Sequence, residues 1–579
     1  MIKRLAPYMK GFGKDALMAP ALITVESVCE LFLPLLMAGI IDSGINGDGG
    51  MSYIWKAGAA MAVISVISLL AGVGASKYSA IASQGFGRNL RESLFDKIQS
   101  FSFADIDRFS SASLITRLTN DVNSIQMTLM MGLRMLMRAP LLLITSLIVC
   151  LTLNARLTLV LVVVIPVMSL GVYAIMRRCY SLFTTFQEKI DSLNDKVQEN
   201  LVAVRVVKAF VRAEHEKKKF KKANDELRDA GLAAVMRVIL MQPIMMLAMY
   251  AAIFGVMWFG GRFVAEGTML SGELYSFFSY IGQILMSVLM VAFCLLQLTR
   301  ASACAKRVIE VLDATPDIAD PAELCAEPPR SGSVEFRDVS FKYRAGTGDD
   351  VLHGIDLKIE PGQFVAVVGG TGTGKSTLVN LIPRFYDVTS GSVLVDGRDV
   401  RDFSVEELRG RIGMVLQSNV LFSGTVRENL LWGDPDASEE QLVQAARDAE
   451  AYDFIMAMPE GFDTRLDQGG VNVSGGQKQR LCIARAMLRH PEILILDDST
   501  SAVDSATEAR IRSSFSENLS GTTVIIIAQR ISSVRHADKI VVLDDDHIAE
   551  CGTHDELMAL GGIYCEICQS QQEGGLGNG

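Results

Sequence analysis

Residues 369 to 377 form a glycine-rich stretch with the spacing of a phosphate-binding loop. The stretch GGTGTGKST follows an apolar run, FVAVV, and opens a helical pattern. Glycines let backbone N–H groups curl around phosphate oxygens, and the N-terminus of the following helix adds positive potential. In such a loop Lys375 reaches the outer phosphates and Ser376 binds magnesium. The predicted loop comprises Gly369, Gly370, Thr371, Gly372, Thr373, Gly374, Lys375, Ser376 and Thr377.

The stretch LILDDSTSAVD, residues 494 to 504, places two acids after an apolar strand. Asp497 ends the predicted strand, where a carboxylate can hold magnesium or its water. Asp498 follows at the position where a nucleotide-hydrolysing site is expected to carry a glutamate that orients water. A phosphate loop followed by a strand acid is the order found in nucleotide hydrolases, so the two stretches together predict a site for ATP and Mg2+.

The composition indicates a membrane part joined to a soluble part. The chain has 579 residues, 50% of them hydrophobic, and a mean hydropathy of +0.30. It is too long for one ordinary domain and too apolar for a purely soluble protein. A formal net charge of -10 argues against a nucleic-acid partner, because phosphate contacts need a basic surface.

Six apolar stretches reach the length of about 20 residues that a membrane-spanning helix needs. An even number of spans puts both termini on one side. The two long segments between spans are basic, one of them carrying KKKFKK at 217 to 222, so the bias of positive charge predicts that they and both termini are cytosolic. We expect them to be helical extensions that turn near 103–121 and 200–210 as coupling helices. The stretches are residues 16–41, 54–80, 136–153, 157–176, 238–265 and 275–299.

After residue 312 the pattern becomes that of an α/β domain. Proline and acidic residues accumulate over 313–332, which we interpret as a linker. Short β-branched runs then alternate with helical patterns. The predicted fold is therefore a membrane α-helical domain, 1–312, fused to a soluble α/β P-loop nucleotide-binding domain, 333–570, with a flexible tail, 571–579.

A further set of motifs makes the resemblance to a family specific. SGGQ at 474 to 477, together with GGTGTGKST, LDDSTSAVD and the closing ECGTHDEL, resembles the ATPase domain of ABC transporters, and six spans ahead of it resemble a half-size ABC exporter of the type IV fold. The resemblance implies ATP and Mg2+ as cofactors. It implies adenine stacking on Tyr343, metal contacts by Ser376, Gln417 and Asp497, and a contribution to a partner's ATP site by Ser474, Gly475, Gly476, Gln477 and Asp504.

Two departures from the family pattern fall on one site. Asp498 replaces the expected glutamate, and Gln529 in IIIAQR replaces the expected switch histidine. Removing one methylene withdraws a carboxylate by roughly 1.3 Å, and a misplacement of about 1 Å can cost on the order of 10²-fold in rate. Glutamine does not titrate near neutrality as histidine does. The signature differs only in Val473, whereas Asp467 and Gln468 stand where exporters usually carry Gly-Glu.

The pattern resembles the degenerate-site subunit of a heterodimeric, multidrug-type exporter. We therefore expect an ATP-binding/permease subunit in the plasma membrane, of the bacterial inner-membrane kind, that moves apolar or amphipathic, drug- or lipid-like compounds from the cytosol or inner leaflet. Its partners would be a non-identical ABC half-transporter, membrane lipid and the substrate. A homodimeric exporter with slow ATPase, an importer on the exporter fold and an ATP-gated channel or sensor remain as alternatives.

Three smaller features have two interpretations each. Glu26 and Glu30, four residues apart in the first span, either have a cation-recognising or coupling role or pair with a neighbouring helix. The methionines of the fifth span either line an adaptable cavity or pack as ordinary helix contacts. Cys565 and Cys568 have CxxC spacing, but buried thiols are a simpler interpretation than a metal or redox site.

Overall fold

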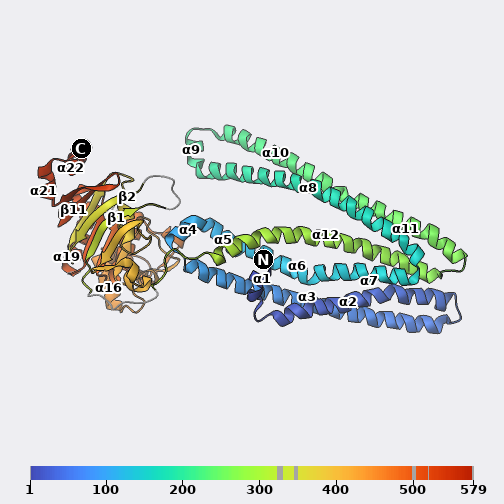
Figure 1. The fold of residues 1–579 in the computed structure, drawn as a ribbon. Coiled ribbons are helices and arrows are strands. Elements are labelled where there is room, and N and C mark those ends of the chain that lie inside the picture. Colours follow the sequence, from blue (N-terminus) through green and yellow to red (C-terminus); the bar gives the residue numbers. More distant parts are fainter. Residues whose placement is uncertain (1, 322–329, 344–349, 499–503, 519–520, 577–579) are drawn as a thin grey trace. The chain divides into compact units, whose positions relative to one another are not determined.

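The computed structural model describes residues 2–321, 330–343, 350–498, 504–518 and 521–576. Parts of the predicted linker, 322–329, of SAVD, 501–503, and of the predicted tail, 577–579, lie outside the described residues. Backbone contacts divide the chain into two units, Met1–Ile98 with Leu114–Ala314, and Gln99–Ser113 with Thr315–Gly579. The first unit is helical, and the second holds the β-sheets (Figure 1).

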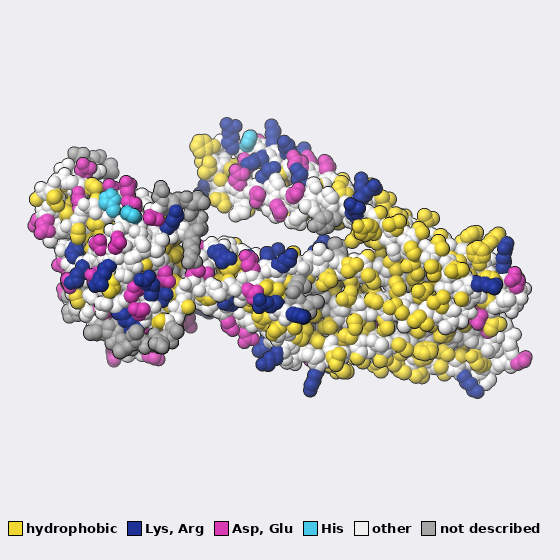
Figure 2. Space-filling view, in the orientation of Figure 1, with side chains coloured by type: hydrophobic (Ala, Val, Ile, Leu, Met, Phe, Trp, Pro, Cys, Tyr) yellow, Lys and Arg dark blue, Asp and Glu magenta, His cyan; other side chains and the backbone are white. Residues whose placement is uncertain are grey.

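The helical unit carries six segments long and apolar enough to cross a membrane, counted over the described residues. At most 29% of the most apolar window of each segment is buried within the chain, so most of their hydrophobic side chains face outward. Figure 2 shows these side chains over α2, α7 and α11, whereas Lys and Arg gather over α10. The segments are Gly13–Ile45, Gly50–Gln99, Ser111–Leu153, Ala155–Val202, Ala213–Ala265 and Ser271–Asp313.

Short helical turns interrupt or precede several of these segments. Segments of π-helix occur in the first and third spans, and a short helix, α9, lies between the long helices α8 and α10. The helices are α1 (Ile2–Leu5), η1 (Ala6–Met9), α2 (Gly13–Gly39), η2 (Ile40–Ile45), α3 (Gly50–Gln99), α5 (Ser111–Thr116), η3 (Arg117–Asp121), α6 (Val122–Met131), η4 (Gly132–Leu136), α7 (Met137–Leu153), α8 (Ala155–Val202), α9 (Val204–Ala209), α10 (Ala213–Ile239), α11 (Met241–Ala265) and α12 (Ser271–Asp313).

The two acids of the first span are paired within the helical unit. Arg138, near the start of α7, donates to Glu26 at 2.8 Å and also to Glu30. A Cβ atom on Gly72 of α3 would lie 3.2 Å from the Glu26 carboxyl group, so a glycine leaves room for that side chain. Of the two interpretations given by the sequence, the structure therefore shows pairing with a neighbouring helix.

The second unit is built on two main sheets that lie close in the fold (Figure 1). The six-stranded sheet has the order β12-β11-β3-β10-β9-β6, and β11, β3, β10, β9 and β6 run parallel. The four-stranded sheet has the order β2-β1-β4-β5 and is antiparallel. The strands are β1 (Val334–Phe341), β2 (Leu352–Ile359), β3 (Phe364–Gly369), β4 (Ser390–Val395), β5 (Arg398–Asp399), β6 (Ile412–Val415), β7 (Gly424–Thr425), β8 (Arg465–Leu466), β9 (Ile493–Asp497), β10 (Thr523–Ile527), β11 (Lys539–Asp544) and β12 (His547–Gly552).

The central strands are apolar on both faces because helices or the second sheet cover them. Ile493 to Leu496 of β9 are fully buried, as expected of parallel strands inside an α/β domain. The helices of this unit are α4 (Phe103–Phe109), α13 (Lys375–Leu381), η5 (Val400–Asp402), α14 (Val405–Gly410), α15 (Val426–Leu430), α16 (Glu439–Asp448), α17 (Tyr452–Met456), η6 (Gly461–Asp463), η7 (Gln468–Gly470), α18 (Gly475–Leu488), α19 (Ser505–Asn518), α20 (Ile531–Val534), α21 (His554–Leu560) and α22 (Ile563–Leu576).

Candidate nucleotide site

The parallel strands bring the predicted site residues to one edge of the large sheet. The phosphate loop follows β3, Asp497 ends β9, Gln529 lies two residues after β10, and Gln417 lies two residues after β6. These strands are neighbours in the order β3-β10-β9-β6. Because the carboxyl ends of parallel strands meet at the same edge, this arrangement gathers residues that are far apart in the sequence.

The glycine-rich loop between β3 and α13 has a backbone that glycine accommodates. Gly369, Gly372 and Gly374 have φ angles of 148°, 90° and 84°, values that favour glycine. At Gly369 a Cβ atom would also lie 2.2 Å from the carbonyl oxygen of Leu543. The Nζ of Lys375 donates to the carbonyl oxygen of Gly369 at 3.0 Å and to that of Gly370. The loop therefore already has the shape of a phosphate-binding loop, and the side chain of Lys375 lies across it.

Ser376 and Asp497 lie together beneath this loop. The Ser376 hydroxyl donates to Oδ1 of Asp497 at 2.9 Å. A hydroxyl and a carboxylate are hard oxygen ligands, and Mg2+ usually combines one or two protein ligands with phosphate and water oxygens. The pair therefore fits a magnesium ion bound together with a nucleotide. No group of three or more His, Cys, Asp or Glu side chains in the described part of the chain forms a metal site of its own.

Burial disfavours the charged forms of the three ionisable groups at this edge. Burial raises the pKa of Asp497, which is 4% exposed, and the neighbouring Asp498 adds to that rise. Burial also raises the pKa of Asp498, against the opposing effects of Lys375 and of a hydrogen bond from Gln529. The pKa of Lys375 is lowered by burial. A bound cation and phosphate groups would supply compensating charges to these groups.

Asp498 and Gln529 are in direct contact. The Nε2 of Gln529 donates to Oδ2 of Asp498 at 2.8 Å. Asp498 has a φ of 46°, a left-handed value for a residue with a side chain, and its N–H donates to the carbonyl oxygen of Ile527 at 3.1 Å. Two residues that depart from the family pattern, Asp498 and Gln529, therefore form one hydrogen-bonded pair, in which the amide of Gln529 binds one carboxylate oxygen.

Tyr343, the predicted adenine contact, lies beside a cavity of about 830 Å³. Its hydroxyl is 3.0 Å from Oγ1 of Thr377, in the helix that follows the phosphate loop. Its ring meets those of Phe341 and Tyr386 edge to face, with centroids 4.9 and 5.2 Å away. The cavity is lined by Tyr343 and Tyr386 and also by Ala104 and Asp107 of α4.

The signature residues Ser474, Gly475, Gly476 and Gln477 form the start of α18. The Ser474 hydroxyl accepts from the N–H of Gln477 at 3.3 Å, and the Gln477 side chain accepts from the N–H of Ser474 at 2.9 Å. This capping box fixes the helix start. Ser474 and Gly475 are exposed, so the N-terminal end of the helix is open to an anion from outside the chain.

Gln417 and Asp504 are both exposed. Gln417 lies in a bend after β6, and Asp504 precedes α19, where its carboxylate accepts from the N–H of Thr507 at 3.0 Å. This backbone hydrogen bond lowers the pKa of Asp504. Gln417 follows β6, one of the strands that end at the edge carrying the phosphate loop.

The short helix α4 belongs to the same unit as the nucleotide site and lies beside the cavity. The rings of Phe103 and Phe385 stack with centroids 4.4 Å apart. The hydroxyl of Tyr386 donates to the Asp107 carboxylate at 2.9 Å, and burial together with that carboxylate raises the pKa of Tyr386. One of the turns at which the sequence predicts coupling thus contacts the segment that follows the phosphate-loop helix.

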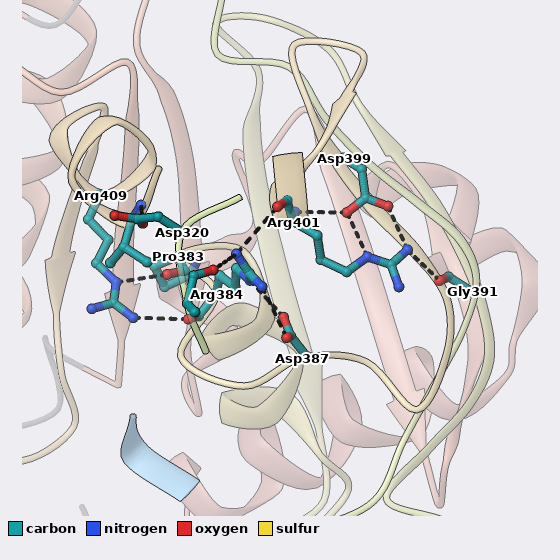
Figure 3. Close-up of polar contacts among 10 residues, drawn as sticks. Asp320, Pro383, Arg384, Asp387, Gly391, Asp399, Arg401 and Arg409 are labelled. Atoms are coloured by element: carbon teal, nitrogen blue, oxygen red, sulfur yellow. Dashed lines mark hydrogen bonds and ion pairs between the residues drawn. The ribbon is translucent and has the colours of Figure 1, made fainter. Parts of the chain in front are cut away.

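A network of arginines holds that segment in place (Figure 3). Arg384, which is 6% exposed, donates to both carboxylate oxygens of Asp387. Arg409 donates to the carbonyl oxygens of Pro383 and Arg384 at 3.1 and 3.0 Å. Because Arg409 binds the backbone before Phe385 and Arg384 binds the carboxylate of Asp387 after Tyr386, the segment that contacts α4 is held at both of its ends.

Sequence reasoning missed three residues that contact the site. The side-chain amide of Gln479 lies 3.5 Å from the carbonyl oxygen of Asp498. Tyr386 contacts both Tyr343 and α4. Gln571 of α22 binds the backbone on either side of Arg530, next to Gln529. A polar residue on the buried face of α18, Gln479, was the one available signal, since buried amides need partners.

The chain joins six helices that can span a membrane to an α/β domain with a phosphate loop at the edge of its sheet. This combination defines an integral membrane protein that binds a nucleotide. The ABC transporter transmembrane region matches residues 17–288, and the ABC transporter domain matches residues 352–501. The chain belongs to the ABC transporter family, and it is a half-size exporter with permease and ATP-hydrolysing parts in one polypeptide.

Several relatives resemble the chain over most of its length. It is 38% identical to an uncharacterized ABC transporter ATP-binding protein, YfiB, of Bacillus subtilis, over 98% of both chains. An ATP-dependent lipid A-core flippase of Syntrophus aciditrophicus is 37% identical over 88% of this chain and 84% of its own. A putative multidrug export ATP-binding/permease protein, YgaD, of Bacillus subtilis is 33% identical over 96% of this chain and 97% of its own.

A solved structure has the same fold. A bacterial Atm1-family ABC exporter with ATP bound superposes with a TM-score of 0.82 at 25% identity, over 97% of this chain and 98% of that one. The predicted fold, six spans fused to an α/β nucleotide-binding domain, is confirmed.

Proposed function

We propose that this chain is the ATP-binding, hydrolysis-poor half of a heterodimeric exporter. The observation that carries the proposal is the pair Asp498 and Gln529, whose side chains are joined at 2.8 Å beside Lys375 and Asp497. Asp498 is one methylene shorter than the expected glutamate, and Gln529 cannot gain a proton as histidine does. ATP would be held by the phosphate loop and Tyr343, and magnesium by Ser376, Asp497 and Gln417, with slow hydrolysis at this site.

The nearly intact signature supports a second role for the same chain. Ser474 and Gly475 are exposed at the start of α18, where a helix N-terminus favours an anion. In a head-to-tail pair, Ser474 to Gln477, with Asp504, would meet the γ-phosphate held by the other subunit. The chain would then complete an efficient site on its partner while its own site mainly binds ATP.

We infer that the cargo is apolar or amphipathic, of the drug or lipid kind. The names of two relatives, a lipid A-core flippase and a putative multidrug export protein, support this class. The chain would lie in the bacterial cytoplasmic membrane with both termini in the cytosol, as the basic extensions favour. Residues 1–312 would form the permease, 313–332 the linker and 333–570 the ATP-binding domain.

We further propose that α4 transmits closure of the ATP-binding domains to the spans. Support comes from the stacking of Phe103 on Phe385 and from the Tyr386–Asp107 hydrogen bond. The turn near 200–210, which contains α9, would act in the same way on the partner. Gln417 would sense magnesium and pass its presence toward these turns.

A restoration experiment tests the poor site with changes in this chain alone. Gly475→Asp places a negative charge where the partner's γ-phosphate would lie, and it should therefore abolish hydrolysis at the partner's site. The helix itself should tolerate the change, because an acidic residue is favourable at a helix N-terminus. On that background, Asp498→Glu with Gln529→His should raise ATP hydrolysis at least about tenfold, because roughly 1 Å of misplacement is removed. The measurement is steady-state ATP hydrolysis by the purified complex.

Matched controls separate the possible results. Each single restoration on the Gly475→Asp background should give a smaller rise than the pair. If Gly475→Asp alone leaves hydrolysis unchanged, the signature does not serve an active partner site and the proposal is wrong. If the double restoration adds nothing, Asp498 and Gln529 are not what limits this site.

A further inference from the structure

The C-terminal helix α22 presents one buried face that ends at the segment carrying Gln529. Tyr564 and Cys568 are 0% and 2% exposed and belong to the same apolar cluster as Ile526 of β10. Positions 564, 568 and 571 follow the spacing of one helix face. The buried face therefore directs the next polar residue in that series, Gln571, toward the end of β10.

The carboxamide of Gln571 binds the backbone at two points. Its Nε2 donates to the carbonyl oxygen of Gln529 at 2.7 Å, and its Oε1 accepts from the N–H of Ile531 at 2.9 Å. A primary amide can donate and accept at once, whereas a carboxylate can only accept. Gln571 thus fixes both peptide groups that flank Arg530.

The position of α22 is set by contacts away from the nucleotide edge. The Glu550 carboxylate of β12 accepts from the N–H groups of Ile563 and Tyr564, at 2.6 and 3.1 Å. The Tyr564 hydroxyl lies 2.8 Å from Nδ1 of His554. Because these contacts anchor the start of the helix, Gln571 reaches Gln529 from a fixed support.

We propose that Gln571 is a positioning residue that holds the Gln529 amide against Asp498 and thereby sets how firmly this chain's own site retains nucleotide. The inference rests on the function proposed above, in which Gln529 and Asp498 form part of this chain's own ATP site. It connects α22 to Asp498 through three hydrogen bonds: two between the Gln571 carboxamide and the backbone around Arg530, and one from Gln529 to Asp498. The identity of this residue would tune the lifetime of ATP on the binding half.

The test measures nucleotide release from this chain within the complete complex. An azido-ATP photoprobe is bound with Mg2+ and chased with unlabelled ATP, and the label remaining on each of the separated chains is followed with time. In Gln571→Glu, release from this chain should be about three- to tenfold faster, as expected from the loss of a neutral hydrogen bond. Gln571→Ala, which removes both bonds without adding a charge, should act in the same direction.

The matched control is Gln569→Glu, an exposed residue of the same helix whose side chain contacts Cys565 of its own helix. It should leave release unchanged, and label on the partner chain should be retained normally in all variants, because a general loss of structure would affect both chains. Release at the wild-type rate in both Gln571 variants would overturn the inference. In that case, faster hydrogen exchange at the Ile531 amide would show that the Gln571 bond had been lost without an effect on nucleotide release. The proposed function would be unaffected, because it is tested by the Asp498 and Gln529 variants.

Discussion

At the scale of single residues, the membrane-embedded contact of Arg138 with two carboxylates gives a direct prediction. Arg138→Leu leaves Glu26 and Glu30 without their cation in the first span. Partial exposure moderates the effect, so the cost should be about 1–3 kcal/mol, below that of a fully buried pair. Thermal unfolding of the detergent-solubilised complex should show a lower midpoint.

Two companions sharpen this measurement. Arg134→Leu removes an exposed cation one helical turn earlier and should leave the midpoint close to that of the wild type. Adding Glu26→Gln and Glu30→Gln to Arg138→Leu should restore most of the loss, because unpaired carboxylates are then absent. If Arg138→Leu melts like the wild type, the contact contributes nothing to stability.

At the scale of elements, the docking of α4 on Phe385 and Tyr386 predicts a coupling defect. Phe103→Ala removes the stacked ring, whose contact is worth about 0.5–1.5 kcal/mol beyond its area. Transport in vesicles, with a hydrophobic fluorescent compound as cargo, should fall about fivefold relative to ATP hydrolysis. Phe95→Ala, at a side chain that is 52% exposed in α3, is the matched control. Equal loss of transport in both variants would contradict a specific role for α4.

The same elements show what the sequence could and could not predict. The six spans could be predicted from hydropathy. The phosphate loop and the apolar strand that ends in Asp497 could be predicted from local spacing, because each of these signals lies within a few residues. The Arg138–Glu26 pair joins residues 112 positions apart, and the Gln571–Gln529 contact joins residues 42 apart. Such pairs depend on which helix faces meet, and single-chain periodicity does not specify that.

The surface that α4 contacts could not be predicted from the sequence for a related reason. The sequence places a coupling turn near 103–121, but the receiving surface, Phe385 and Tyr386, gives no motif of its own. Its shape comes from Arg384 and Arg409 binding backbone carbonyl groups around it (Figure 3). A surface made from main-chain geometry leaves little trace in residue type.

At the scale of the whole molecule, a membrane permease is fused to an ATP-binding domain, and the proposed function makes the ATP site of this chain a poor hydrolytic site. The most direct measurement is ATP hydrolysis by the complex purified from its native membrane through a tag on this chain, comparing wild type with Asp498→Asn. We expect nearly equal rates, because in the proposed heterodimer hydrolysis would occur at the site that the signature of this chain completes on its partner. A collapse of the rate would make Asp498 catalytic, contradict the degenerate site, and favour a homodimer.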